Sequence, residues 1–499
     1  MPSSKPCNVP GMPGVDEDQL EEDFDDNLAA GGGRVGSFIR NLQYLEKWLL
    51  LGIIIGVVAG AGAVLFYLAL RYTSHFLLGY VAGYHLPTPL VEGGSPGSRH
   101  YPRPWALPLV TTAGALVSAV IVAKFAPEAS GHGTDSAIEA IHTDPRHIRA
   151  RVVLVKLVTS ALTIGSGGSA GREGPTAQIS AGFASFLTRR LHLSDDDGRI
   201  LVSLGVGAGI GAIFGAPLGG AVLAASIVYR EDFEYRVLYP GFVTSATAFA
   251  VFGSFLGFDP MFGYVDAEYR FEKAWPLLWF VVLGIVCAAI GFLFAWVFYA
   301  TEGLTTRIPG ASVLAPTIGG LLVGLMGLAI PQVLSSGYGW VQLATTKQGL
   351  LTIPLWVVLI LPIAKIVATS LSIGTGGSGG IFGPGIVIGA FVGAAVWRLG
   401  EMFHLPGVPD SPGIFVVVGM MACFGSVAHA PLAILIMVAE MTGSFSVVPG
   451  AIIAVGIASL LMHRTKMSIY RSQRCDRESA AAERLQAAAA ASGLTPPRF

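Results

Sequence analysis

The sequence predicts an all-α polytopic membrane protein, and three observations carry this prediction. Of the 499 residues, 53% are hydrophobic and only 13% are charged, about half the charged fraction of a typical soluble domain. Apolar runs near the ~20 residues needed to cross a bilayer recur along the whole chain. These runs are continuous and do not alternate between apolar and polar residues, which disfavours a transmembrane β-barrel.

The predicted spans fall into two groups. The long, clear runs are Trp48–Leu70, Trp105–Phe125, Leu201–Tyr229, Leu277–Ala300, Leu350–Ile373 and Ile414–Ala439. The less clean runs are Leu154–Ile164, Val237–Phe255, Val313–Ile330, Gly385–Trp397 and Val447–Met462. In the first run, Gly52, Gly56 and Gly60 stand four residues apart, a spacing that favours close helix packing.

The two ends of the chain differ from this apolar body. Residues 1–36 are acidic, with "DEDQLEEDFDD" at Asp16–Asp26, and are predicted to be a disordered tail. Residues 37–475 form the expected transmembrane domain, with halves at about residues 45–258 and 275–463. Residues 476–499 are expected to be a short cytoplasmic tail containing a short helix.

The distribution of charge and cysteine excludes several classes of protein. A net charge of −1 gives no nucleic-acid signature. The four cysteines are scattered and are interpreted as packing thiols, without a disulfide framework or metal-ligand spacing. Basic residues cluster at three places in the chain, and the positive-inside rule assigns all three to the cytoplasm. These residues are Arg146, Arg149, Arg151, Lys156, Arg189, Arg190, Arg464, Lys466, Arg471 and Arg474. We therefore expect a cytoplasmic C-terminus and a protein of the plasma membrane.

An internal duplication is the most informative feature. The segment "GSGGSAGREGP" (Gly165–Pro175) matches "GTGGSGGIFGP" (Gly374–Pro384) at seven of eleven positions. A second pair, Gly205–Leu218 and Gly419–Leu432, shares glycines and an Ala-Pro-Leu ending at a similar offset. Broken apolar segments at corresponding positions of two halves are typical of a transporter's binding site. The sequence alone leaves open whether the halves are parallel or inverted.

The glycine-rich breaks predict an anion site. Each precedes an apolar helix, with Pro175 or Pro384 in its first turn. The N-terminus of a helix presents unpaired N–H groups and a partial positive charge, and two such ends can hold an anion without a full cation. Glu173 lies among these amides, where a carboxylate is expensive unless it has a function. We expect Glu173 and the anion to compete for one site, so that protonation of Glu173 favours the open state. A buried ion pair with Arg172 is the structural alternative.

Several motifs in the same order resemble the CLC family of chloride channels and proton/chloride antiporters. "GREGP" (Gly171–Pro175) resembles its gating-glutamate motif, and "GGIFGP" (Gly379–Pro384) its second filter motif. "PEASGHGTD" (Pro127–Asp135) is similar to the first filter segment, and "KMSIY" (Lys466–Tyr470) to the segment with the central tyrosine. The motifs "APLGG" (Ala216–Gly220) and "APLAILIMVAEMT" (Ala430–Thr442) also match. The resemblance spans Leu45 to Tyr470.

This resemblance implies a homodimer with one pore per subunit, each of about eighteen helices in two inverted repeats. Glu173 becomes the gate for chloride or a similar small anion, and bound chloride ions are expected without any other cofactor or metal. The anion-binding positions it implies are His132, Gly171, Arg172, Gly380, Ile381, Phe382 and Tyr470. On residue chemistry alone, Arg172 is better interpreted as paired or snorkelling, and Tyr470 as an interfacial anchor.

Two departures from the family pattern bear on function. His132 stands where chloride-preferring members have serine, so anion preference and pH sensitivity stay open. Ser226 and Ile227 stand where antiporters carry an internal proton-transfer glutamate, and neither side chain can carry a proton. Glu231 and Asp232 follow one turn later, in a stretch typical of a cytoplasmic helix end. We therefore expect passive conduction or weak coupling, with a proton-coupled antiporter as the alternative. The family's paired nucleotide-sensing domains are not expected after Tyr470.

One further alternative comes from another class. "GGSAG" (Gly167–Gly171) fits the G-x-S-x-G pattern of serine hydrolases, with Ser169 as nucleophile. The same serine recurs at Ser378 in the second half, which a single nucleophile would not require. We therefore do not expect an enzyme.

Overall fold

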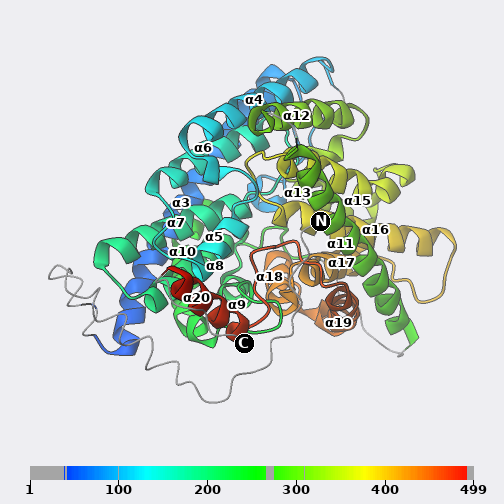
Figure 1. Cartoon of the computed structure of the whole chain (residues 1–499). Coiled ribbons are helices and arrows are strands. Elements are labelled where there is room, and N and C mark those ends of the chain that lie inside the picture. The colour runs from blue at the N-terminus through cyan, green and yellow to red at the C-terminus, as the bar shows by residue number, and fades with distance from the viewer. Residues whose placement is uncertain (1–38, 40–41, 99–100, 266–274, 308–309, 492–499) are drawn as a thin grey trace.

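The computed structural model describes residues 39, 42–98, 101–265, 275–307 and 310–491, and within them the chain is helical (Figure 1). The eighteen α-helices of this part are α3 (Tyr44–Ser74), α4 (Ala106–Phe125), α5 (Thr134–His142), α6 (Ala150–Gly165), α7 (Glu173–Leu191), α8 (Asp195–Phe214), α9 (Pro217–Ser226), α10 (Tyr235–Leu256), α11 (Leu278–Thr305), α12 (Ala311–Ala329), α13 (Tyr338–Ala344), α14 (Lys347–Leu351), α15 (Leu355–Thr369), α16 (Phe382–Met402), α17 (Gly413–Val427), α18 (Pro431–Thr442), α19 (Val448–Thr465) and α20 (Arg477–Ala491). Of the helices in these ranges, nine are long and apolar enough to cross a membrane. The predicted disordered tail, residues 1–36, lies outside the described residues.

Two of the predicted long spans are wrong as single helices. The run Leu201–Tyr229 is divided between α8 and α9, and Ile414–Ala439 between α17 and α18. In the first break Gly215 adopts φ +66°, and in the second His429 adopts φ +51°. A left-handed residue ends a helix, and the proline two residues later begins the next one. Both breaks fall at corresponding points of the duplicated segments, so the halves share this feature.

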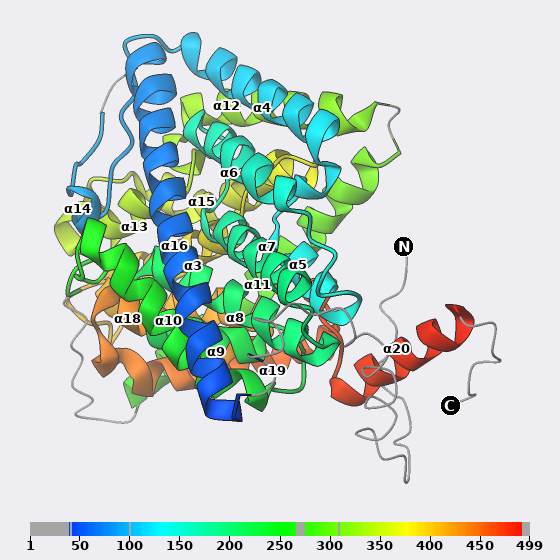
Figure 2. The ribbon, with the colours of Figure 1, turned by 90° about the vertical axis from the view of Figure 1, so that its left-hand side faces the viewer.

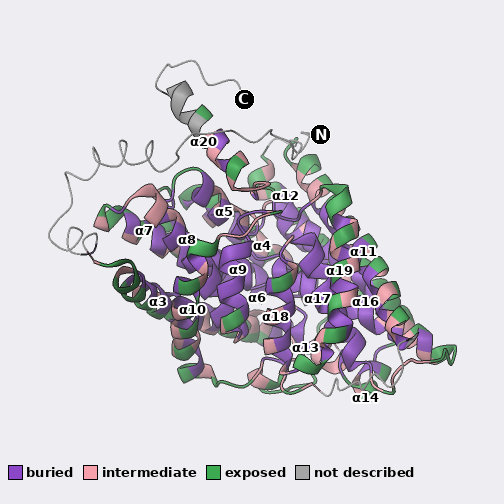
Figure 3. Cartoon of the chain, turned by 90° about the horizontal axis from the view of Figure 1, so that it is seen from below, coloured by how far each residue is buried: buried purple, intermediate pink, exposed green. Residues whose placement is uncertain are grey.

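The two halves are inverted relative to each other. Helices α5 and α13 occupy corresponding positions, and each follows a glycine with positive φ, +82° at Gly133 and +86° at Gly337. In Figure 2, α5 and the red helix α20 lie on the right, whereas α13 and α14 lie on the left. In Figure 3, α5 and α20 lie in the upper part of the view, and α13 and α14 lie in the lower part. Because equivalent helices start from opposite faces, the repeat axis lies in the plane of the membrane.

Small residues allow the outer helices to pack closely. A Cβ at Gly56 would lie 2.6 Å from the Thr244 carbonyl oxygen, and one at Gly60 would lie 2.5 Å from that of Ala248. The packing role predicted for Gly52, Gly56 and Gly60 is therefore confirmed, and their partner is α10. Exposed apolar side chains lie along the outer helices, and buried residues concentrate between them (Figure 3). The broken segments thus lie in an interior that the outer helices surround.

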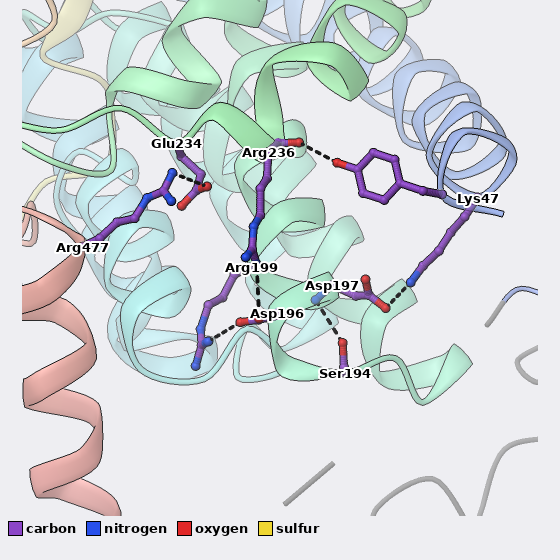
Figure 4. A network of polar contacts seen from close by, with 9 residues as sticks. Lys47, Ser194, Asp196, Asp197, Arg199, Glu234, Arg236 and Arg477 are labelled. Atoms are coloured by element: carbon purple, nitrogen blue, oxygen red, sulfur yellow. Dashed lines mark hydrogen bonds and ion pairs between the residues drawn. The ribbon is translucent and has the colours of Figure 1, made fainter. Parts of the chain in front are cut away.

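Polar contacts join the helix ends on the face that carries α20. Lys47 at the start of α3 pairs with Asp197 in α8, and the Ser194 side chain accepts a hydrogen bond from the Asp197 N–H at 3.2 Å (Figure 4). Arg477 of α20 pairs with Glu234 at 3.1 Å. These ion pairs hold the ends of α3, α8 and α20 together on one face of the protein.

The cysteines behave as predicted at two positions. Cys287 and Cys423 are free thiols buried in the core. Cys475 is disulfide-bonded, so its interpretation as a packing thiol is wrong. The spacing of scattered cysteines does not reveal which of them the fold brings together.

Candidate functional site

The duplicated glycine-rich segments meet at the centre of the molecule. The N–H of Gly171 donates to the Gly380 carbonyl and the N–H of Gly380 donates to the Gly171 carbonyl, both at 2.7 Å. These residues occupy corresponding positions of the two repeats, so the reciprocal pair marks the two-fold axis. Helices α7 and α16 begin two residues beyond it, with Pro175 and Pro384 in their first turns. Since each of these two N–H groups donates to the carbonyl of the other glycine, they join the segments, and the N–H groups that follow remain for other acceptors.

The side chain of Glu173 crosses from one half to the other. It is fully buried, at 0% exposure, in the first turn of α7. Its Oε2 accepts a hydrogen bond of 3.1 Å from the N–H of Gly383, in the first turn of α16. Its Oε1 accepts a hydrogen bond from the hydroxyl of Tyr338. The carboxylate thus occupies the electropositive end of the opposite half's helix, as the sequence predicts for a group that competes with an anion.

Glycine is required at two positions around this carboxylate. A Cβ at Gly171 would lie 2.2 Å from Glu173 Oε2, and one at Gly383 would lie 3.0 Å from the same atom. Gly174 has a similar role, because a Cβ there would lie 2.1 Å from the His132 carbonyl oxygen. A Cβ at any of these positions would displace a neighbouring group, so the glycines let three chain segments close around the site.

Arg172 lines the approach to Glu173 from the face opposite α20. It forms an ion pair with Glu92, and its Nε lies 4.0 Å from Glu173 Oε1. Its guanidinium also lies over the rings of Tyr67 and Tyr338, 5.7 and 5.3 Å from their centroids. These residues line a cavity of about 640 Å³. Glu92 is therefore the principal partner of Arg172, and Glu173 takes its hydrogen bonds elsewhere.

His132 and Tyr470 lie together on the inner side of the crossing. Their ring centroids are 5.7 Å apart, and Phe298 packs against His132 at 6.1 Å. Both side chains are buried, and neither His132 Nδ1 nor the Tyr470 hydroxyl has a hydrogen-bond partner among the described residues. Buried polar atoms normally have partners, and an unfilled pair points to a ligand or water. The structure thus brings together two of the residues that the family resemblance singles out.

Ile381 and Phe382 stand at the start of α16. Ile381 is the N-cap and Phe382 the first residue of the helix, so their N–H groups have no acceptor within the helix. The Phe382 ring packs on Phe424 at 4.3 Å and on Phe214 at 5.1 Å between centroids. These aromatic contacts fix the start of α16 and keep its surroundings apolar.

Two buried lysines were not predicted as site residues. Lys156 donates to the carbonyls of Ala129 and Gly131 at 3.1 and 2.7 Å, and Lys365 donates to those of Val333 and Ser335 at 2.9 and 2.8 Å. Both are fully buried at corresponding positions of the repeats, and neither has a carboxylate partner among the described residues. Each clamps the loop before α5 or α13. The assignment of Lys156 to a cytoplasmic surface cluster is wrong. The burial of these lysines could have been predicted from the sequence, because each stands nine residues before the first glycine of a duplicated glycine-rich segment.

Asp135 lies at a mouth on the face that carries α20, three residues after His132. Its carboxylate accepts a hydrogen bond of 2.9 Å from the N–H of Ser472, two residues after Tyr470. It lines a cavity of about 390 Å³ together with Glu128 and Glu139. Burial raises the pKa of Asp135 to about 6, and the Ser472 N–H acts in the opposite direction. The charge at this mouth therefore changes within the physiological pH range.

The segment expected to hold a proton-transfer residue is apolar. Ile227 is fully buried, and its carbonyl accepts a hydrogen bond of 3.0 Å from Gln473. Glu231 and Asp232 lie on the α20 face, where Asp232 is 3.8 Å from Arg477. Neither of these acidic residues replaces the missing glutamate in the core.

Ser169 does not have the surroundings of a nucleophile. Its hydroxyl pairs with that of Thr369 at 3.1 Å, and Ser378 pairs in the same way with Ser160 at 3.0 Å. These contacts are corresponding ones in the two repeats. Both serines thus join the halves through hydroxyl contacts.

Comparisons with known proteins identify the family. The model of the voltage gated chloride channel family matches residues 114–463. A putative chloride channel protein ClcB-like of Ralstonia nicotianae is 33% identical over 369 residues, which cover 72% of this chain and 83% of that protein. An H(+)/Cl(-) exchange transporter ClcA of Citrobacter koseri is 28% identical over 445 residues, covering 86% and 89%.

A solved structure agrees with this match at the level of the fold. The crystal structure of a slow cyanobacterial Cl-/H+ antiporter superposes with a TM-score of 0.71 at 23% identity, covering 85% of this chain and 96% of that one. The chain therefore belongs to the CLC family of voltage gated chloride channels, as its motifs predict. It is an integral membrane protein of a family of transporters rather than enzymes.

Proposed function

We propose that this protein moves chloride or a similar small anion across the membrane through a path gated by Glu173. The observation that carries the proposal is the position of the Glu173 carboxylate on the N–H of Gly383, at the start of α16. A carboxylate and a halide present the same charge to such N–H groups, so one can replace the other. Protonation removes the charge of Glu173 and thereby favours the anion.

The path leads from the outer cavity past Glu173 to the inner pair of His132 and Tyr470. The N–H groups of Ile381 and Phe382, together with the Tyr470 hydroxyl, are the proposed anion ligands. His132 Nδ1 supplies a further donor when it carries a proton. Arg172 attracts anions into the outer cavity, whereas Gly171 and Gly380 position the two helix ends. Bound chloride ions are expected at these positions.

The proposed mode of transport is passive conduction or weak coupling to protons. The apolar Ile227 and the small Ser226 at the expected proton-transfer positions support this mode, because neither can carry a proton through the inner half. A proton-coupled antiporter is the second candidate. It is favoured by the exchange transporter among the relatives and by Asp135, whose pKa of about 6 lets it take up a proton along the inner path.

The proposed assembly and location follow the family resemblance. We propose a homodimer with one anion path in each subunit, in the plasma membrane, with the C-terminus in the cytoplasm. The basic residues on the face of α20, such as Arg474 and Arg477, support a cytoplasmic position for that face.

Chloride efflux from reconstituted vesicles tests both parts of the proposal. Wild type and Glu173→Ala are compared with and without a proton ionophore while the internal pH is followed. We expect Glu173→Ala to raise efflux at neutral pH and to remove its dependence on the outer pH. Equal efflux and equal pH response in both proteins would contradict the gate. Proton movement driven uphill by a chloride gradient in wild type would replace passive conduction by antiport.

A further inference from the structure

The outer side of the gate carries a hydroxyl that none of the family motifs in the sequence contains. Tyr338 is the first residue of α13 and is only 2% exposed. Its hydroxyl donates to Glu173 Oε1, while the Gly383 N–H donates to the other carboxylate oxygen. One donor comes from each of two separate helices, so the carboxylate is held from both sides.

The rest of the Tyr338 side chain is fixed independently of this bond. Its ring packs edge-on against Phe214 at 6.3 Å and Phe262 at 6.1 Å between centroids. The Arg172 guanidinium lies 5.3 Å from the ring centroid. Because these contacts involve the ring alone, the hydroxyl is not needed to keep the side chain in place.

The start of α16 is shaped to admit this hydroxyl. A Cβ at Gly383 would lie 2.3 Å from the Tyr338 oxygen, closer than any real contact. A residue larger than glycine at position 383 would therefore push the hydroxyl away from Glu173. Tyrosine at 338 and glycine at 383 are thus a matched pair around the gate.

We propose that Tyr338 is a positioning residue that latches Glu173 in its closed position. This inference rests on the proposed gate and adds the group that sets how firmly it closes. Opening breaks the hydrogen bond from the hydroxyl to a charged acceptor. A bond of this kind shifts the closed-to-open ratio by roughly 10- to 150-fold.

The latch also sets the pH at which the gate opens. A donor that stabilises the carboxylate opposes its protonation, so its removal moves opening to higher pH. The charged groups facing this carboxylate are Arg172 and, beyond it, Glu92, and Tyr338→Phe leaves both in place. A tenfold change in the ratio moves the midpoint by about one pH unit.

Chloride efflux across a pH series tests the latch in Tyr338→Phe and Gly383→Ala. We expect Tyr338→Phe to raise efflux at neutral pH about tenfold or more, up to the level of Glu173→Ala, and to move the pH midpoint upward by about one unit. Gly383→Ala should shift the midpoint in the same direction. The matched control is Tyr67→Phe, because the Tyr67 ring also contacts Arg172, at 5.7 Å, but its hydroxyl has no hydrogen bond to Glu173 in the described residues; this variant should keep the wild-type midpoint.

The Glu173→Ala background separates the latch from the gate. There, Tyr338→Phe should cause no further change, because the carboxylate through which it acts is gone. An unchanged pH midpoint in Tyr338→Phe, or an equal effect with and without Glu173, would overturn the latch while the gate stands. Wild-type efflux and pH response in Glu173→Ala alone would instead overturn the gate.

Discussion

Glu173→Gln removes the charge of the gate while keeping its size. The carboxylate accepts two hydrogen bonds, from the Gly383 N–H at 3.1 Å and from the Tyr338 hydroxyl. A hydrogen bond to a charged acceptor contributes about 1.5–3 kcal/mol, and one to a neutral acceptor about 0.5–1.5 kcal/mol. Two bonds that each lose about 1–1.5 kcal/mol weaken closure by ~2–3 kcal/mol. The closed-to-open ratio should therefore fall roughly 30- to 150-fold.

Radioactive chloride uptake into vesicles measures this effect when the pH on the outer side is varied between 4.5 and 8 and the pH on the inner side is held constant. Wild-type uptake should rise as the pH falls, whereas Glu173→Gln should be high and flat across the range. The matched control is Glu440→Gln, because Glu440 also accepts hydrogen bonds from the N–H groups at the start of a helix, those of Leu218 and Gly219 at 3.1 and 2.7 Å. This control should keep the wild-type pH profile. A Glu173→Gln profile that still rises at low pH would refute the reasoning.

Three further predictions concern stability and the inner mouth. Gly393→Ala places a Cβ 1.9 Å from the Phe415 carbonyl oxygen and should lower the stability by about 1–3 kcal/mol, measured by thermal unfolding in detergent. Its control is Gly456→Ala, where a Cβ meets nothing within 4 Å and the stability should not fall. Equal melting temperatures of the two variants would contradict the packing. Lys156→Met leaves the Ala129 carbonyl oxygen unpaired, while that of Gly131 keeps the Gly379 N–H, and should cost about 1–3 kcal/mol in the same assay; a wild-type melting curve would disprove this loss. Asp135 is charged above its pKa of about 6 and then repels anions at the inner mouth. Efflux should therefore increase as the inner pH falls through 6, and Asp135→Asn should remove that increase. An unchanged response to the inner pH in Asp135→Asn would contradict this role.

The sequence predicts the site well where the signal is local. Gly171, Glu173 and Pro175 lie in a glycine-rich break that recurs in the second half, and helix-end chemistry alone indicates an anion site there. The meeting of these segments followed from the duplication, and the reciprocal pair of Gly171 and Gly380 agrees with it.

The sequence predicts the site poorly where the contact is distant in the chain. The hydrogen bond from Tyr338 to Glu173 spans 165 positions, and no periodicity indicates it. Lys156 was assigned to a surface because basic residues precede it, although its burial depends on the loop carbonyls it binds. The break at Gly215 was missed because hydropathy ignores backbone conformation, and a left-handed residue divides the span without changing its composition.

The central claim is that the Glu173 carboxylate and the anion compete for one place at the start of α16. The most direct measurement is anomalous diffraction from crystals grown in bromide, for wild type and Glu173→Ala. A bromide peak within hydrogen-bond distance of the Gly383 N–H in the variant, and its absence there in wild type, is the predicted result. An empty position in the variant, or a bromide that shares the site with the carboxylate in wild type, would contradict the account.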